Sequence, residues 1–94
     1  MSAYCYIVEC IDGSFYTGWT TDPQRRLKQH NAGSGARYTR ARCPVQLVYV
    51  EVQPNRSMAM KREKTIKKLS HAQKQALADE KKISDGGDVS ESIS

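Results

Sequence analysis

Tyrosines are concentrated near the start of the chain, in the stretch YCYIVECIDGSFYTG (residues 4–18). Three of the five tyrosines fall here, and Tyr6 and Tyr16 stand on either side of Asp12-Gly13. A phenol has an apolar ring and a polar tip, so the pair either packs within a sheet or directs two hydroxyl groups at a substrate. The residue types alone leave both interpretations open.

A guanidinium and an imidazole follow at helical spacing. Arg26 and His30 are four residues apart, so in a helix they share one face. Leu27 points in another direction and is the expected contact with the core. The shared face therefore carries one permanent cation and one group that gains or loses a proton near neutral pH.

Glu63 lies on or beside a stripe of positions that should be apolar. Ala59, Glu63 and Ile66 follow one another at spacings of four and three. One interpretation is an edge position at which Glu63 pairs with Lys67 or Arg62. The other is that a half-buried acid needs a dedicated partner or a metal ion.

The tyrosines require a hairpin whose register decides where they point. Residues 3–10 and 14–19 are rich in β-branched and aromatic residues around Asp12-Gly13, which predicts two antiparallel strands. A two-residue turn puts Tyr6 and Tyr16 on opposite faces. A three-residue loop with Gly13 left-handed puts all even-numbered residues on one face, together with the bare backbone at Gly18.

The rest of the pattern predicts an α+β fold. It is a three-stranded, mainly antiparallel sheet flanked by helices in the order β-β-α-β-α-α. Asp22-Pro23 predicts the start of the first helix, which ends near Gly33. The remaining expected elements are a mobile basic loop at 32–44, a buried strand at 45–52, a helix at 58–69 capped by Ser57, and a helix at about 71–82 with a Ser70–Gln73 capping box.

Charge is unevenly distributed along the 94 residues. The net charge is +5, but residues 1–78 hold 13 Lys/Arg against 5 Asp/Glu, whereas residues 79–94 hold 2 against 5. A compact basic domain attracts polyanions, of which nucleic acid is the commonest, although a solvated surface gives the same composition. We expect one domain at 1–80 and a disordered acidic tail at 81–94.

The cysteines and the apolar residues indicate the compartment. Cys5, Cys10 and Cys43 are odd in number and form no C-x-x-C pair. No stretch has the length of a membrane span, and the N-terminal residues lack the pattern of a secretory signal. We therefore expect reduced thiols, no structural zinc site, no membrane association and a cytoplasmic location.

The ordered set of these residues resembles the signature of the GIY-YIG endonuclease superfamily, and most closely its small stand-alone members. The likeness covers about residues 3–75 and is carried by Tyr6, Tyr16-Thr17-Gly18, Arg26, His30-Asn31 and Glu63. Two positions depart from the family pattern. Tyr4 replaces the glycine of the first motif, and Thr17 replaces the isoleucine of the second.

The resemblance implies the role of each residue. Tyr6 would be the general base beside the attacking water, Tyr16 would position water and phosphate, and Arg26 would contact the scissile phosphate. His30 would assist proton transfer, Gly18 would allow close approach of the backbone, and Glu63 would bind one Mg²⁺ or Mn²⁺. One carboxylate is enough for such a cation, since Mg²⁺ keeps most of its waters. We expect these side chains to converge on one concave surface.

The basic loop is the predicted grip on the substrate. Arg37, Arg40 and Arg42 can contact phosphates, and Tyr38 can stack on an exposed base. The resemblance implies a structure-selective DNA endonuclease linked to repair or recombination, and leaves RNA open as a substrate. A protein partner that supplies targeting is compatible with the absence of a recognisable specificity domain. The alternatives are a non-catalytic nucleic-acid-binding module of the same fold and a protein-interaction adaptor.

Overall fold

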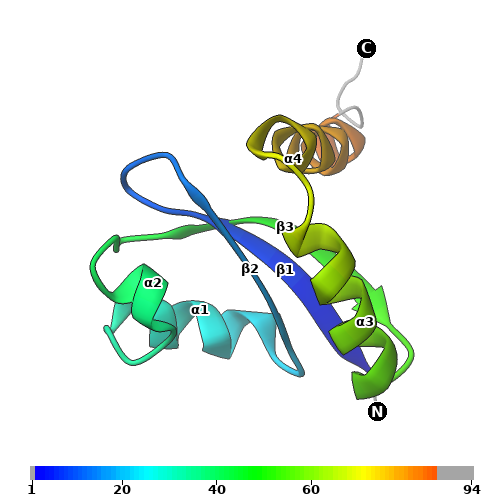
Figure 1. The fold of residues 1–94 in the computed structure, drawn as a ribbon, viewed down its shortest axis with the longest axis horizontal. Coiled ribbons are helices and arrows are strands. Elements are labelled where there is room, and N and C mark those ends of the chain that lie inside the picture. Colours follow the sequence, from blue (N-terminus) through cyan, green and yellow to red (C-terminus); the bar gives the residue numbers. More distant parts are fainter. Residues whose placement is uncertain (1, 87–94) are drawn as a thin grey trace.

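Three strands form the centre of the computed structural model, which describes residues 2–86 (Figure 1). The strands are β1 (Ala3–Glu9), β2 (Phe15–Thr20) and β3 (Gln46–Gln53), in the order β2-β1-β3, with both neighbouring pairs antiparallel. The predicted α+β class and the element order are confirmed, with one short helix added. None of the helices in this part of the chain is long and apolar enough to cross a membrane.

The hairpin adopts the longer of the two loops. Tyr6 pairs with Gly18 and Val8 pairs with Tyr16, while Gly13 has a φ of 85°. A positive φ is costly for residues with a Cβ atom, so glycine suits this bend. Because the side-chain period of a strand is two, this register puts Tyr6, Tyr16 and Gly18 on the same face.

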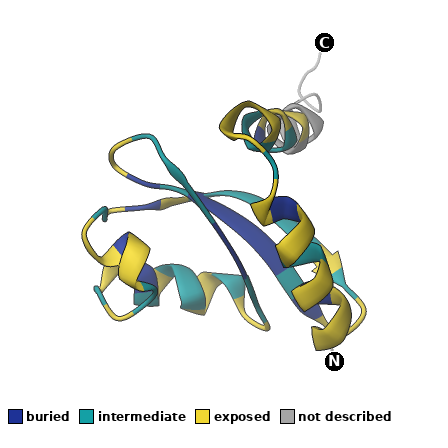
Figure 2. Cartoon of the chain, in the orientation of Figure 1, coloured by how far each residue is buried: buried dark blue, intermediate teal, exposed yellow. Residues whose placement is uncertain are grey.

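The two faces of the sheet carry separate cores. On one face Tyr6, Val8, Cys10 and Val45 are buried and pack with half-buried Leu27 from the first helix. On the other face a second cluster is completely buried: Ala3, Cys5, Ile7, Ala59 and Ile66. The dark blue of β1 in Figure 2 shows that the central strand is the most buried element.

The helices are divided between these faces. Helices α1 (Pro23–Asn31) and α2 (Arg37–Arg40) lie on the side of Tyr6, and α3 (Arg56–Lys67) packs against β1 and β2 from the other side. Asp22 caps α1 as predicted, because its Oδ1 accepts a hydrogen bond from the Arg25 amide at 3.1 Å.

The start of α3 differs from the prediction. Asn55, and not Ser57, is the cap, because its Oδ1 accepts a hydrogen bond from the Met58 amide at 2.9 Å. Asn and Ser are equally good caps, so residue type could not decide between them. The Ser70–Gln73 capping box at the start of α4 (His71–Gly86) is confirmed by two reciprocal hydrogen bonds of 2.8 and 3.1 Å.

Three other expectations need correction. The basic loop is not irregular throughout, since residues 37–40 form α2. Strand β3 is an edge strand that is mostly half-buried, because β1 takes the central position. The expected tail at 81–94 overlaps α4, which runs to Gly86 because residues 72–82 are rich in good helix formers. Residues 87–94 lie outside the described residues.

Candidate active site

Tyr6 occupies the centre of the candidate site. It comes from the central strand, is only 2% exposed, and its hydroxyl lies 2.8 Å from Nε2 of His30. The ring tip lies directly over Gly18 of the neighbouring strand, where an added Cβ would come within 2.5 Å of the Tyr6 oxygen. Gly18 is therefore required for the phenol to reach His30.

His30 connects Tyr6 to the basic loop. It is completely buried at the end of α1, and its Nδ1 lies 2.7 Å from Oγ1 of Thr39, which is also completely buried. The backbone at Gly35 is packed against the His30 ring. Thr39 was not predicted, because a threonine within a basic segment shows no periodicity that marks it as buried.

The electrostatics of the pair favour the neutral forms. Burial raises the pKa of the Tyr6 phenol, and the nearby Arg26 guanidinium opposes that rise. Burial, reinforced by the Arg26 charge, lowers the pKa of the His30 imidazole. At neutral pH the site thus holds a protonated phenol and an uncharged imidazole, which is the state in which the imidazole can accept a proton.

Tyr16 lies beside this pair and joins it to α2. Its ring meets the edge of the His30 ring at a centroid distance of 5.4 Å and stacks on Tyr38 at 6.0 Å. Arg42 covers the Tyr38 ring at 3.9 Å and forms an ion pair of 3.2 Å with Asp12. Arg42 therefore holds Tyr38 and the hairpin loop together, and its predicted contact with substrate stays a prediction.

Arg37 and Arg40 differ from Arg42 in their surroundings. Both are exposed on α2, and neither forms an ion pair within the residues that the structure describes. They are the members of the predicted basic grip that remain available to a phosphate. Tyr38, at 37% exposure, presents the outer face of the cluster.

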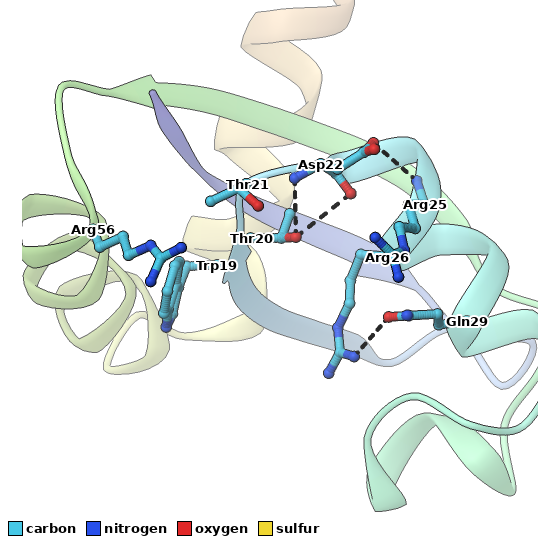
Figure 3. A pocket seen from close by; sticks show the side chains of 8 residues that line it. All are labelled: Trp19, Thr20, Thr21, Asp22, Arg25, Arg26, Gln29 and Arg56. Carbon is cyan, nitrogen blue, oxygen red and sulfur yellow. Dashed lines mark hydrogen bonds between the residues drawn. The ribbon is translucent and has the colours of Figure 1, made fainter. Parts of the chain in front are cut away.

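Arg26 stands between the tyrosines and a cavity at the end of β2. Its guanidinium donates a hydrogen bond to Gln29 at 3.0 Å, which holds it along α1 (Figure 3). The cavity has a volume of about 380 Å³ and contains one acidic side chain against three guanidinium groups. Its lining residues are Trp19, Thr20, Thr21, Asp22, Arg25, Arg26, Gln29 and Arg56. Arg25 and Arg56 add positive charge to the site that was not predicted from the sequence.

Glu63 lies on α3, which packs against the other face of the sheet. Its side chain is 18% exposed and lies 3.5 Å from the Lys67 ammonium, whose nitrogen is also 5.9 Å from the centre of the Tyr16 ring. Arg62 is not its partner, because Arg62 forms a two-pronged ion pair with Glu51 at 2.8 and 3.2 Å. Lys67 thus links the carboxylate to the tyrosine cluster.

The side chains predicted to converge lie on two sides of the sheet. Tyr6 and Tyr16 both contact His30 on one face of the sheet, with Gly18 beneath the phenol of Tyr6. The Arg26 charge acts on both Tyr6 and His30. Glu63 is carried by the helix on the other side of the sheet and approaches through Lys67, so its place in a single concave surface stays a prediction.

The metal-binding capacity rests on one carboxylate. Within residues 2–80, whose side chains the structure describes, no group of three or more His, Cys, Asp or Glu side chains could enclose a metal ion. Mg²⁺ accepts such a site, because it retains waters and takes further oxygen ligands from a substrate phosphate. Glu63 fits this limited role, provided that the cation replaces the Lys67 ammonium as its partner.

The chain is similar to known proteins over most of its length. Residues 2–76 match the family described as the GIY-YIG catalytic domain. A UPF0213 protein of Halobacterium salinarum is 57% identical over 74 residues, which make up 79% of this chain and 96% of that protein. A UPF0213 protein of Streptococcus sanguinis is 53% identical over 79 residues, or 84% of this chain and 91% of that protein.

Two solved structures are similar in fold and in sequence. The solution NMR structure of a UPF0213 protein from Bacillus halodurans is 48% identical, covers 84% of each chain and has a TM-score of 0.53. The solution NMR structure of a protein from E. faecalis is 47% identical, covers 81% of each chain and has a TM-score of 0.55. The sequence match and the fold match cover nearly the same share of the chain.

Proposed function

The chain belongs to the GIY-YIG catalytic domain family, and we propose that it is a divalent-metal-dependent endonuclease that hydrolyses phosphodiester bonds in DNA. The observation that carries this proposal is the buried hydrogen bond between the Tyr6 hydroxyl and His30 Nε2. A phenol needs no imidazole in order to pack in a sheet. A phenol that takes a proton from water does need an acceptor for its own proton. We assign this activity to residues 1–80, and selectivity for branched structures in repair or recombination is part of the proposal.

The proton path starts at the attacking water. Tyr6 takes a proton from this water as its own hydroxyl proton passes to His30 Nε2, 2.8 Å away. Burial keeps His30 uncharged beforehand, so it can receive that proton. A phenol with a pKa of about 10 is rarely ionised at neutral pH, so alone it is a poor general base. An imidazole that accepts the phenol proton as the water proton arrives makes prior ionisation unnecessary.

The phosphate is held by Arg26. Its planar fork can bind two phosphate oxygens at once and stabilises the charge that grows on them in the transition state. The cavity beside Arg26 continues along the end of β2, and Arg25 and Arg56 give it positive charge. At the other end of β2, Tyr16 contacts Tyr38 of the basic α2 segment.

These two basic regions define the path of the substrate. Residues Tyr16 to Thr20 span roughly 13 Å at about 3.3 Å per residue. A nucleic-acid strand that follows this edge of the sheet contacts Arg37 and Arg40 on one side of the scissile phosphate. On the other side it contacts Arg25 and Arg56.

The divalent cation would be held by Glu63. When bound, it would neutralise phosphate charge and polarise the leaving oxygen. The chain's own contribution is the half-buried carboxylate and its neighbour Lys67, which balances the charge of Glu63 when no cation is bound.

One specific observation favours a second function, the binding of nucleic acid without cleavage. Glu63 already has a cationic partner in Lys67, and the described residues offer no multi-carboxylate site. A binding module keeps the fold and the free arginines and has no need of a metal ion.

Nicking of supercoiled plasmid and of branched DNA tests the proposal. Wild-type protein with Mg²⁺ or Mn²⁺ is compared with Glu63→Gln, and Lys68→Gln, at the exposed residue that follows α3, serves as a control. We expect cleavage by wild type and the control, none by Glu63→Gln, and equal DNA binding by all three in EDTA. An RNA hairpin of the same sequence reports the substrate class. Binding without cleavage in any divalent metal would support the second function.

A further inference from the structure

The Thr39 hydroxyl lies between two possible hydrogen-bond partners in the interior of the protein. Its Oγ1 is 3.0 Å from the carbonyl oxygen of Ala36 and 2.7 Å from Nδ1 of His30. A threonine hydroxyl carries one proton, so it can donate to only one of these two atoms and accepts through its lone pairs. The choice determines which nitrogen of His30 is protonated.

The Tyr6 hydroxyl decides between the two arrangements. If Thr39 donates to His30 Nδ1, then His30 Nε2 carries the ring proton and donates to Tyr6. The Tyr6 proton then has no other acceptor within the described residues, and Tyr6 is only 2% exposed. A buried donor without a partner costs about 1–3 kcal/mol.

The opposite arrangement satisfies the three side chains. Thr39 donates to Ala36, His30 Nδ1–H donates to Thr39 Oγ1, and the Tyr6 hydroxyl donates to the bare Nε2. Among the described residues the Ala36 amide competes with this arrangement, because it donates to Nδ1 when that nitrogen is bare. At 3.5 Å its hydrogen bond is weak, whereas the contact of Nδ1 with Thr39 Oγ1 is 2.7 Å.

We propose that Thr39 is a positioning residue that holds His30 in the Nδ1–H tautomer, so that Nε2 accepts the proton of Tyr6. The catalytic consequence rests on the proposed endonuclease function, whereas the tautomer is a property of the folded chain. Thr39 acts through His30 and does not touch the reacting atoms.

The resulting proton transfers balance. The attacking water gives one proton to Tyr6, Tyr6 gives one to His30 Nε2, and His30 becomes an imidazolium whose Nδ1–H still donates to Thr39. The water oxygen forms a bond to phosphorus as the bond from phosphorus to the leaving oxygen breaks. That oxygen keeps the bonding pair and takes a proton from solvent.

Thr39 also connects the Tyr6–His30 pair to the basic helix α2. Thr39 is flanked by Tyr38 and Arg40 in α2, the short helix whose exposed face carries the free arginines. A shift of α2 that removed Thr39 from His30 would leave Nδ1–H without its acceptor. The chain of hydrogen bonds from Tyr6 through His30 to Thr39 is therefore complete only when α2 packs against His30.

The direct test is ¹⁵N NMR of the protein with labelled histidine, at a pH where His30 is neutral. Protonated and bare ring nitrogens give well-separated shifts, and His71→Gln identifies the second histidine. We expect His30 to be protonated at Nδ1 in wild type and in Thr39→Ser, which keeps the hydroxyl. Thr39→Val replaces the hydroxyl by a methyl group of similar size and should lose this single tautomer.

Cleavage measurements form the second arm. Thr39→Val should lower kcat on the order of 10² with little change in KM, and Thr39→Ser should restore most of it. Thr65→Val is the matched control, because Thr65 bonds only to its own helix at the Lys61 carbonyl.

The two arms separate failure of this inference from failure of the proposed function. An Nε2–H tautomer in wild type, or an unchanged Nδ1–H tautomer in Thr39→Val, would overturn the assignment of Thr39. The wild-type spectrum decides the point even if Thr39→Val does not fold. Absence of cleavage with the Nδ1–H tautomer observed would reject the nuclease while the role of Thr39 in setting the tautomer stands.

Discussion

Substitution of Gly18 by alanine places a methyl group where the Tyr6 phenol now lies. The new Cβ would be 2.5 Å from the Tyr6 oxygen and 2.7 Å from its Cζ atom, and ordinary contacts begin at 3.4 Å. The phenol oxygen must therefore retreat by about 0.9 Å. It cannot do so and keep its 2.8 Å bond to His30, because both rings are enclosed by the core.

Two effects of different size follow. Overpacking of a core costs about 1–3 kcal/mol, of which alanine regains about 0.5–1 kcal/mol because it is less flexible than glycine. The net loss of about 0–2.5 kcal/mol lowers Tm by at most about 20 °C for a domain of this size. A displacement of nearly 1 Å at the general base costs about 10² in the cleavage rate.

The assay compares single-turnover cleavage and thermal unfolding of Gly18→Ala with those of Gly13→Ala. Gly13 has a positive φ and open space around its Cα atom, so Gly13→Ala should lose stability through backbone strain and keep its cleavage rate. Gly18→Ala should lose both. A folded Gly18→Ala protein that cleaves at the wild-type rate would refute the assignment of the Tyr6 hydroxyl to the base.

Other predictions address charge and pH. Burial lowers the pKa of His30 below 6.5, so the unfolded chain binds this proton first, and the free energy of unfolding should fall as pH drops below 6.5. Chemical denaturation between pH 7 and 5 should show this slope in wild type and a flatter one in His30→Gln; equal slopes would contradict it. Arg40→Gln should reduce the salt dependence of DNA binding by about 0.9 in log–log slope, since one phosphate contact is lost. The ion-paired Arg42 should affect that slope less, and a larger effect at Arg42 would reverse the assignment. Arg26→Gln should reduce the single-turnover cleavage rate by about 10²–10³. Its affinity for DNA, measured by binding titrations in EDTA, should fall far less.

The fold was predictable where local patterns and tertiary packing agree. Asp22-Pro23 marks a helix start that needs no distant contact, and the Ser70–Gln73 box is complete within four residues. The register around Gly13 could not be decided, because both turns suit the same residues. It is fixed by the demand that Tyr6 and Val8 share a core face with Tyr16 and pack against α1.

The site was predictable only in its residue types. Tyr6 and His30 were expected together, but their direct bond depends on Gly18 and on the depth of β1 within the sheet. Thr39 was missed because its role depends on a hydrogen bond to the His30 ring, nine residues away in the chain. No sequence pattern around Thr39 indicates that contact. Arg56 was missed because it joins the cavity beside Arg26 only through folding.

The most direct test of the account is single-turnover cleavage of DNA by Tyr6→Phe. This change removes one hydroxyl group and keeps the ring that fills the core, so the protein should fold and bind DNA as wild type does. The account predicts a loss of about 10²–10⁴ in rate, because the attacking water loses its path to His30. A Tyr6→Phe protein that cleaves as fast as wild type would contradict the central claim that the Tyr6–His30 pair is the base.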